Sequence, residues 1–150
     1  MVQLNIKFDD REVKRVLKSI DKSVKNMKPA MKDVGDRLIK EYEGNFDRQS
    51  TTERKAWKPL KASTVAQRLS QGFGSSPILV RSGKLKKSFF KKVKRLSVLV
   101  SNKKDYFKYH QLGGKVKNRP PKREMLGLSK NLTEDIIEII NKFFRKNIKK

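Results

Sequence analysis

The feature that most constrains the fold is a series of apolar residues at helical spacing between residues 31 and 46. The series consists of Met31, Val34, Leu38, Ile39, Tyr42 and Phe46. Residues three and four positions apart share one face of a helix, so the series predicts an amphipathic helix with a buried face. Pro29 suits its first turn, where backbone N–H groups have no internal partner. The pattern predicts an end near Asn45.

The same spacing predicts three further helices. One follows Asp9, which forms a capping box with Glu12. Its apolar residues are Val13, Val16, Leu17, Ile20, Val24 and Met27. A short helix is expected to be capped by Ser63 and to extend through Leu69. The last helix is expected to be capped by Thr133. Its apolar face is predicted to comprise Leu132, Ile136, Ile137, Ile140, Phe143 and Phe144.

Alternation of apolar and polar residues predicts strands in two places. Val2 to Phe8 alternates cleanly, which is typical of a half-buried strand. In the second place, Phe89 and Val93 share a strand face with Lys91 between them, and Leu96, Val98 and Val100 follow with the same period. This second pair predicts an antiparallel hairpin that turns near Lys94 and Arg95.

These elements predict an α+β fold: a single domain, residues 1–150, with a small antiparallel sheet packed against two N-terminal helices and a C-terminal helix. Hydrophobic residues make up 35% of the chain and charged residues 36%, so apolar residues are scarce for a compact domain. We therefore expect long basic loops that are mobile, at about residues 47–62, 70–77 and 115–123.

Positive charge is concentrated in the middle of the chain. Between Arg54 and Arg123 there are 21 basic residues and one acidic residue, Asp105, whereas both flanks are nearly balanced. A general bias of the composition toward lysine would make the whole chain basic, but both flanks keep their acidic residues. We therefore prefer the interpretation that the middle of the chain forms a basic face that binds a polyanion or an acidic protein. The predicted partner-binding residues are Lys84, Lys86, Lys87, Lys91, Lys92, Lys94, Arg95, Lys103, Lys104, Lys115, Lys117, Arg119, Lys122 and Arg123.

The residue types that carry chemistry are sparse. The chain has no cysteine and one histidine, His110, so clustered metal ligands are not expected and no cofactor is predicted. A triad of Ser82, Asp105 and His110 is conceivable, but "RSG" is not a G-x-S-x-G nucleophile turn. A lone histidine beside tyrosines is more often packed against a backbone carbonyl. We therefore predict that the protein is not an enzyme.

Targeting and membrane signals are also absent from the sequence pattern. No apolar run approaches the roughly 20 residues that span a bilayer, and the first residues lack the apolar region of a signal peptide. The expectation is a soluble intracellular product.

A nucleic-acid-binding protein is the alternative function. Aromatic residues lie among the basic ones, an arrangement typical of surfaces that stack bases on a cationic groove. They are Trp57, Phe73, Phe89, Phe90, Tyr106 and Tyr109. No RNP motif, zinc finger or helix-turn-helix signature accompanies them. This alternative would use the basic face between residues 54 and 123.

Several short motifs in a fixed order carry a resemblance to a known family. After "NF" at Asn45 come "WKPL" (Trp57, Pro59, Leu60), "SGKLKKS" (Gly83, Leu85), "YFKYHQLGG" (Tyr106, His110, Gln111, Gly113, Gly114) and "LGLS" (Leu126, Gly127). The chain from about Lys28 onward resembles the phage virion morphogenesis family, the tail-completion proteins of Mu-like phages. It departs from the family pattern around Arg81 and Ser82, at Phe107, and in "REMLG".

The resemblance implies a structural protein that acts in tail completion or head–tail joining. Its implied partners are tail tube or terminator proteins and head–tail connector proteins. It would act as a homo-oligomeric ring, such as a hexamer, located in the tail or neck of the virion and in the host cytoplasm during assembly. Packaged DNA in the neck is a further candidate partner for the basic face. In the motif itself, Gly113 and Gly114 are expected to adopt positive φ and end a helical turn.

Overall fold

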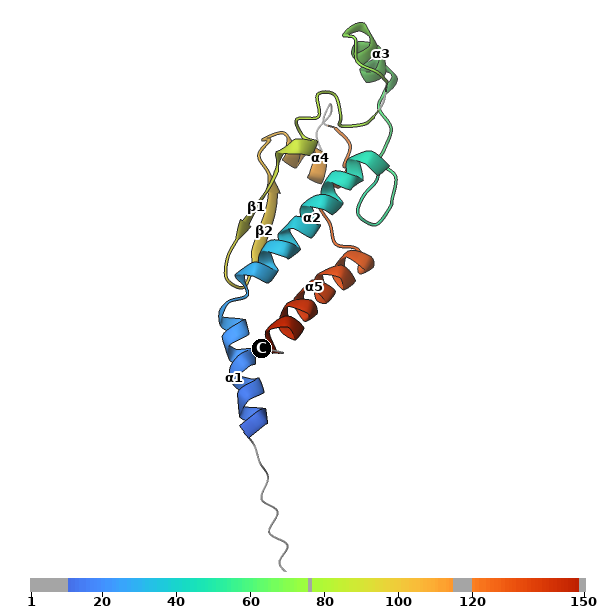
Figure 1. Cartoon of the computed structure of the whole chain (residues 1–150). Helices are drawn as coiled ribbons and strands as arrows, with labels where there is room; N and C mark the ends of the chain where they lie inside the picture. Colours follow the sequence, from blue (N-terminus) through green and yellow to red (C-terminus); the bar gives the residue numbers. More distant parts are fainter. Residues whose placement is uncertain (1–10, 76, 115–119, 149–150) are drawn as a thin grey trace, which may run out of the picture.

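The computed structural model describes residues 11–75, 77–114 and 120–148. Its elements, in chain order, are α1 (Arg11–Lys25), α2 (Lys28–Arg48), α3 (Ala62–Ser70), the 3-10 turn η1 (Lys86–Ser88), β1 (Phe89–Val93), β2 (Val98–Asn102), α4 (Phe107–Leu112) and α5 (Lys130–Ile148). The predicted α+β class with a small antiparallel sheet is confirmed (Figure 1). The strand predicted at Val2 to Phe8 and the cap at Asp9 lie outside the described residues.

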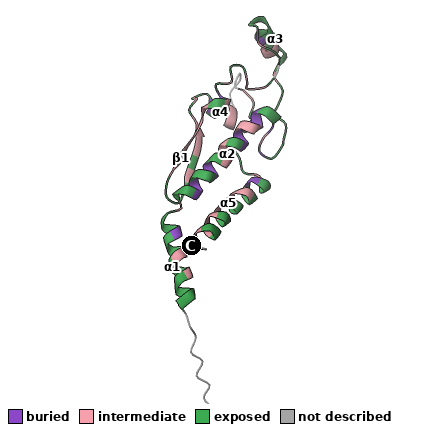
Figure 2. Cartoon of the chain, viewed as in Figure 1, coloured by how far each residue is buried: buried purple, intermediate pink, exposed green. Residues whose placement is uncertain are grey.

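Helix α2 is the centre of the fold, with the β-hairpin on one side and α5 on the other (Figure 1). The predicted apolar series supplies most of its buried face, which is visible along the helix in Figure 2. The first of two core clusters forms there. Its buried members are Ala30, Met31, Val34, Leu38, Tyr42 and Leu132.

The end of α2 lies at Arg48 and not near Asn45 as predicted. Gln49 adopts the left-handed conformation, with φ of 55°, and its backbone N–H donates to Asn45 O. Earlier in the helix, Gly35 allows the hairpin to approach closely. A Cβ atom at this position would lie 2.8 Å from Lys91 Cδ and 2.9 Å from Val98 Cγ2.

Strands β1 and β2 form the predicted antiparallel hairpin, in which Phe89 pairs with Asn102 and Val93 with Val98. The side chains of Phe89, Val93, Val98 and Val100 pack against the α2 cluster. Lys91 lies on the same face, as predicted, because its ammonium donates to Lys32 O and pairs with Asp36 on α2.

The hairpin turn lies where the sequence predicts it, since Lys94 N donates to Ser97 O across the turn at 2.8 Å. The prediction that Leu96 belongs to the second strand is wrong. Leu96 lies inside the four-residue turn and is 53% exposed.

Helix α5 begins earlier than predicted because Ser129, not Thr133, supplies the cap. Ser129 Oγ accepts from Leu132 N at 3.3 Å, and Thr133 lies within the first turn with its hydroxyl donating to Ser129 O. The apolar face is also rotated slightly from the predicted one: Ile139 packs on the α2 cluster, whereas Ile137 is exposed.

Helix α1 forms as predicted, but its apolar face is largely uncovered. Val13, Leu17 and Val24 of its apolar series are all exposed. Helical periodicity shows that a helix is amphipathic and says nothing about what covers it. The helix contacts α5, and Ser19 donates across to Asn147 O as described below.

Helix α3 lies at the opposite end of the molecule from α1 (Figure 1). It begins at Ala62, so Ser63 is inside the helix and not its N-cap; Lys61 takes that position without a side-chain hydrogen bond. After α3 the chain folds back along the helix, and Arg68 holds it there because its Nη1 donates to Pro77 O at 3.1 Å.

Candidate functional site

The motif residues, which are distant in the sequence, meet around the C-terminal end of α2. Trp57 and Leu85 are buried in one cluster, and they come from the segment after α2 and from the turn before η1. The same cluster contains Phe46, Phe107 and Met125. We call this meeting point, together with Gln111 and Arg123, the motif junction.

Aromatic rings fill the centre of the motif junction. Phe46 and Trp57 pack edge to face with ring centres 5.4 Å apart. Phe89 lies 6.1 Å from both Phe46 and Phe107. Phe107 is therefore a core anchor of this chain. Tyr106 and Tyr109, the neighbouring aromatics of the motif, are exposed.

Gln111 holds the segment before α5 in place with its whole side-chain amide. Its Oε1 accepts from Met125 N at 2.8 Å and Leu126 N at 2.9 Å, and its Nε2 donates to Leu126 O at 2.9 Å. Three backbone groups of an irregular segment thus form hydrogen bonds with one side chain, although no neighbouring strand pairs with that segment. Backbone groups left without a partner in such a site would be costly.

Arg123 and Trp57 tie the same segment to the loop after α2. The Arg123 guanidinium is buried and donates to Lys58 O at 2.8 Å and Pro59 O at 3.0 Å. Trp57 Nε1 donates to Glu124 O at 3.0 Å. Burial lowers the pKa of Arg123, but arginine keeps its charge at any ordinary pH. The sequence placed Arg123 on the basic face; the structure places it inside the motif junction.

His110 is half-buried next to the motif junction. Its backbone oxygen accepts from Arg123 N at 2.7 Å, and its ring meets Tyr106 edge to face at 6.3 Å. The Nδ1 atom is buried and has no hydrogen-bond partner among the described residues. Burial lowers the pKa of His110, and the positive charge of Arg123 lowers it further.

Acidification is expected to destabilise the fold through His110. Because its pKa is lowered in the folded state, the unfolded chain binds the proton more readily. The stabilisation is therefore complete above the ordinary histidine pKa of about 6.5 and is lost as the pH falls below it. Urea unfolding of the wild type and His110→Gln at about pH 7.5 and about pH 5.5 tests this. The wild type should lose more stability than the variant, and equal losses would contradict the assignment.

The remaining motif residues lie around the junction. Gly113 ends α4 with φ of 72°, and a Cβ atom there would lie 3.0 Å from Lys122 N. Gly83 also has positive φ, at 70°. The expected positive φ at Gly114 is not observed. Leu60 and Leu126 are half-buried, whereas Pro59, Gly114 and Gly127 are exposed.

Two buried polar residues of α2 were not predicted. Asn45 Nδ2 donates to Thr52 Oγ1 at 3.0 Å and to Met125 O at 2.9 Å. One turn earlier, the Glu41 carboxylate is buried among Arg37, Arg48 and Arg54, at 3.1, 2.5 and 3.5 Å. Both residues occur at core spacing from Leu38, which is the signal that could have identified them.

The predicted basic face divides into two groups. Lys86 and Lys91 turn toward α2 and pair with Asp47 and Asp36, and Lys122 pairs with Glu124 at 3.1 Å. Lys104 is half-buried, and Lys115, Lys117 and Arg119 lie outside the described residues. The exposed group consists of Lys84, Lys87, Lys92, Lys94, Arg95 and Lys103. We call these six the outer basic surface.

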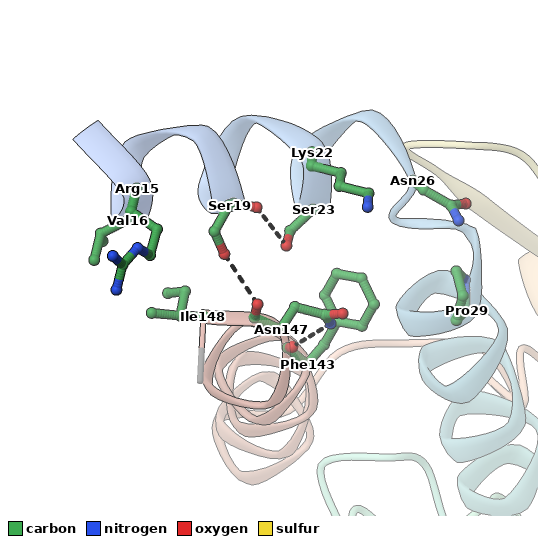
Figure 3. Close-up of a pocket in the computed structure, with 10 residues that line it drawn as sticks. All are labelled: Arg15, Val16, Ser19, Lys22, Ser23, Asn26, Pro29, Phe143, Asn147 and Ile148. Carbon is green, nitrogen blue, oxygen red and sulfur yellow. Dashed lines mark hydrogen bonds between the residues drawn. The ribbon is translucent and has the colours of Figure 1, made fainter. Parts of the chain in front are cut away.

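A pocket of about 430 Å³ lies between α1 and α5 (Figure 3). The polar groups on its wall bond to each other: Ser19 Oγ donates to Asn147 O at 2.9 Å, Ser23 Oγ to Ser19 O, and Asn147 Nδ2 to Phe143 O. The pocket is therefore a loosely packed seam between two helices: Ser19 joins α1 to α5, whereas Ser23 and Asn147 bond within their own helices.

Within residues 11–75, 77–114 and 120–148, no three histidine or acidic side chains are grouped so as to hold a metal ion. No helix in these ranges combines the length and the apolar character needed to cross a membrane.

The comparisons with known proteins give one match. A sequence model of the phage virion morphogenesis family matches residues 8–145. The match begins about one helix earlier than the resemblance, which starts at about Lys28, so it includes α1. The comparison with curated proteins gave no significant match, and neither did the comparison with solved structures.

Proposed function

This chain belongs to the phage virion morphogenesis family, and on that premise we propose that it acts in tail completion or head–tail joining. The role is structural: the chain binds tail and connector proteins and becomes part of the assembled particle. Its place is then the tail or neck of the virion. The proposal rests on family membership together with the way this chain uses its motif residues.

The observation that carries the proposal is the burial of the motif junction. Backbone groups of the chain itself are the hydrogen-bond partners of the Trp57, Gln111 and Arg123 side chains. The His110 ring contacts Tyr106, and the His110 backbone oxygen accepts from Arg123 N. These residues hold three segments in fixed positions, which suits a protein that works by presenting a shaped surface.

Assembly as a ring is the second part of the proposal. Head-to-tail contacts between copies form a ring when the rotation between neighbours closes. The exposed apolar residues of α1, Val13, Leu17 and Val24, provide surface that a neighbouring copy would cover. The tail tube or terminator and the connector are the proposed partners of the assembled ring.

Electron microscopy of particles made without this protein tests the proposal. Lysates of the phage with the gene deleted should contain filled heads and separate tails, and expression of the wild-type gene in trans should restore joined particles. Normal joined particles in the deletion would contradict the proposal. Loss of heads or of tail tubes altogether would also contradict it, because the protein would then act earlier.

The nucleic-acid-binding alternative remains a hypothesis about the partner of the basic surface. It no longer concerns the class of protein, since the family is one of virion morphogenesis.

A further inference from the structure

No acidic side chain neutralises the positive charge of the outer basic surface among the described residues. Its six members are exposed: Lys84 and Lys87 flank the start of η1, Lys92 is on β1, Lys94 and Arg95 are in the turn, and Lys103 follows β2. Within the described ranges none of the six forms an ion pair, and Asp105, the one acid of the segment, pairs with none of them. Folding therefore leaves these six charges exposed to solvent.

The lysines of the hairpin and of η1 fall on two sides, one facing α2 and one facing away from it. The acids of α2 reach only the cations that face the helix, as the pairs Lys86–Asp47 and Lys91–Asp36 show. Lys92 points the other way, with its ammonium 6.0 Å from the centre of the Phe90 ring. Successive residues of a strand alternate between faces, so this separation follows directly from the strand geometry. In Figure 1 the hairpin lies along the flank of α2 with its outer face uncovered.

The charges are spread along the hairpin and do not converge on a point. Five strand residues at about 3.3 Å each separate the η1 end from the turn by about 17 Å. Lys103 belongs to the η1 end, because its N–H donates to Ser88 O at 3.0 Å. A small anion could engage one end only. A duplex carries one charge per about 1.7 Å of its axis, so about ten phosphate charges lie within the same length.

We propose that the outer basic surface binds the phosphate backbone of duplex DNA without reading its sequence. Lysine supplies five of the six cations, and lysine suits phosphate as a mobile point charge. The cores of protein interfaces are instead depleted of lysine. Leu96 and Leu99 are the exposed apolar residues of the hairpin, too few to form the dry centre of a protein interface.

This inference is independent of the tail-completion proposal, because it concerns the purified chain alone. The test uses a fluorescently labelled duplex of mixed sequence and measures anisotropy at several salt concentrations. If all six cations contact phosphates, the logarithm of the binding constant should fall against the logarithm of salt with a slope of about −5. Affinity should then fall about a thousandfold between about 50 mM and about 200 mM salt.

Two variants of equal net charge locate the surface. The surface variant combines Lys87→Gln, Lys92→Gln, Lys94→Gln and Arg95→Gln. The control variant combines Lys18→Gln, Lys28→Gln, Lys130→Gln and Lys142→Gln, four exposed lysines on the helices. The surface variant should reduce the salt slope by about 3 to 4, whereas the control should keep most of it. Thermal melts of both variants check that each remains folded.

Three results would overturn the proposal. The first is no binding of the duplex by the wild type at low salt. The second is an equal loss in both variants, which would show that net charge alone attracts DNA. The third is displacement of the duplex by poly-glutamate at equal charge concentration, which would indicate a surface for acidic proteins.

Discussion

Replacing Trp57 with alanine is expected to destabilise the fold by about 3 to 5 kcal/mol, the usual cost of truncating a buried aromatic residue. The Trp57 side chain is 5% exposed and packs against Phe46, and its indole N–H satisfies Glu124 O. Alanine removes the ring contact and leaves the partly buried Glu124 carbonyl without its donor. For a chain of this length the melting temperature should fall by about 6 to 20 °C, measured by circular dichroism.

Two further variants make the interpretation specific. Trp57→Phe keeps a ring but loses the hydrogen bond, so it should lie between the wild type and alanine. Leu112→Ala changes a side chain that is 74% exposed and should alter stability by no more than about 0.5 kcal/mol. If Trp57→Ala melted as Leu112→Ala does, the motif junction would not be a centre of the fold.

Replacing Arg123 with methionine is expected to cost about 2 to 4 kcal/mol. Methionine retains much of the buried length but cannot donate to Lys58 O and Pro59 O. Hydrogen bonds from charged donors contribute about 1.5 to 3 kcal/mol each, and relief of the buried charge offsets part of the loss. Chemical denaturation monitored through the fluorescence of the single tryptophan measures the effect.

Arg95→Met is the matched control for Arg123→Met, because the same substitution is made in the exposed hairpin turn. It should leave stability within about 0.5 kcal/mol and weaken only the binding of DNA. The opposite division, with Arg95→Met unfolding the chain or Arg123→Met leaving its stability unchanged, would contradict the assignment of Arg123 to the motif junction.

Elements defined by local periodicity could be predicted well from the sequence. The apolar series of α2 and the alternation of β1 and β2 depend on neighbours three, four or two residues away, and all three elements formed. The predicted ends of the helices were less accurate, because several neighbouring residues can serve as the cap. Ser129 provides a cap for α5 ahead of Thr133, and Gln49 extends α2 by taking the left-handed conformation.

The function of individual polar side chains could not be predicted in the same way. In the sequence, Arg123 and Arg95 both belong to basic stretches and cannot be told apart. Arg123 is structural because the fold brings Lys58 O and Pro59 O, which are distant in the chain, within hydrogen-bond distance of its guanidinium. Glu41 likewise needs Arg48 and Arg54 to become a buried ion-pair centre. The apolar face of α1 shows the converse, since its pattern is amphipathic and the described chain covers only part of it.

The resemblance in the motifs identified the right family, and several motif residues are part of the motif junction. Trp57, Leu85 and Gln111 are fold-holding residues. The proposed partner contacts lie on the exposed apolar residues of α1 and on the outer basic surface.

The central claim is that this chain is a structural component of the particle and not a catalyst. Titration of purified wild-type protein into a lysate of the gene deletion tests it, with joined infectious particles as the measure. A structural component is consumed, so the yield should rise in proportion to the protein added and level off when every particle has received its complement. Full joining by protein far below the number of particles, given enough time, would contradict the claim.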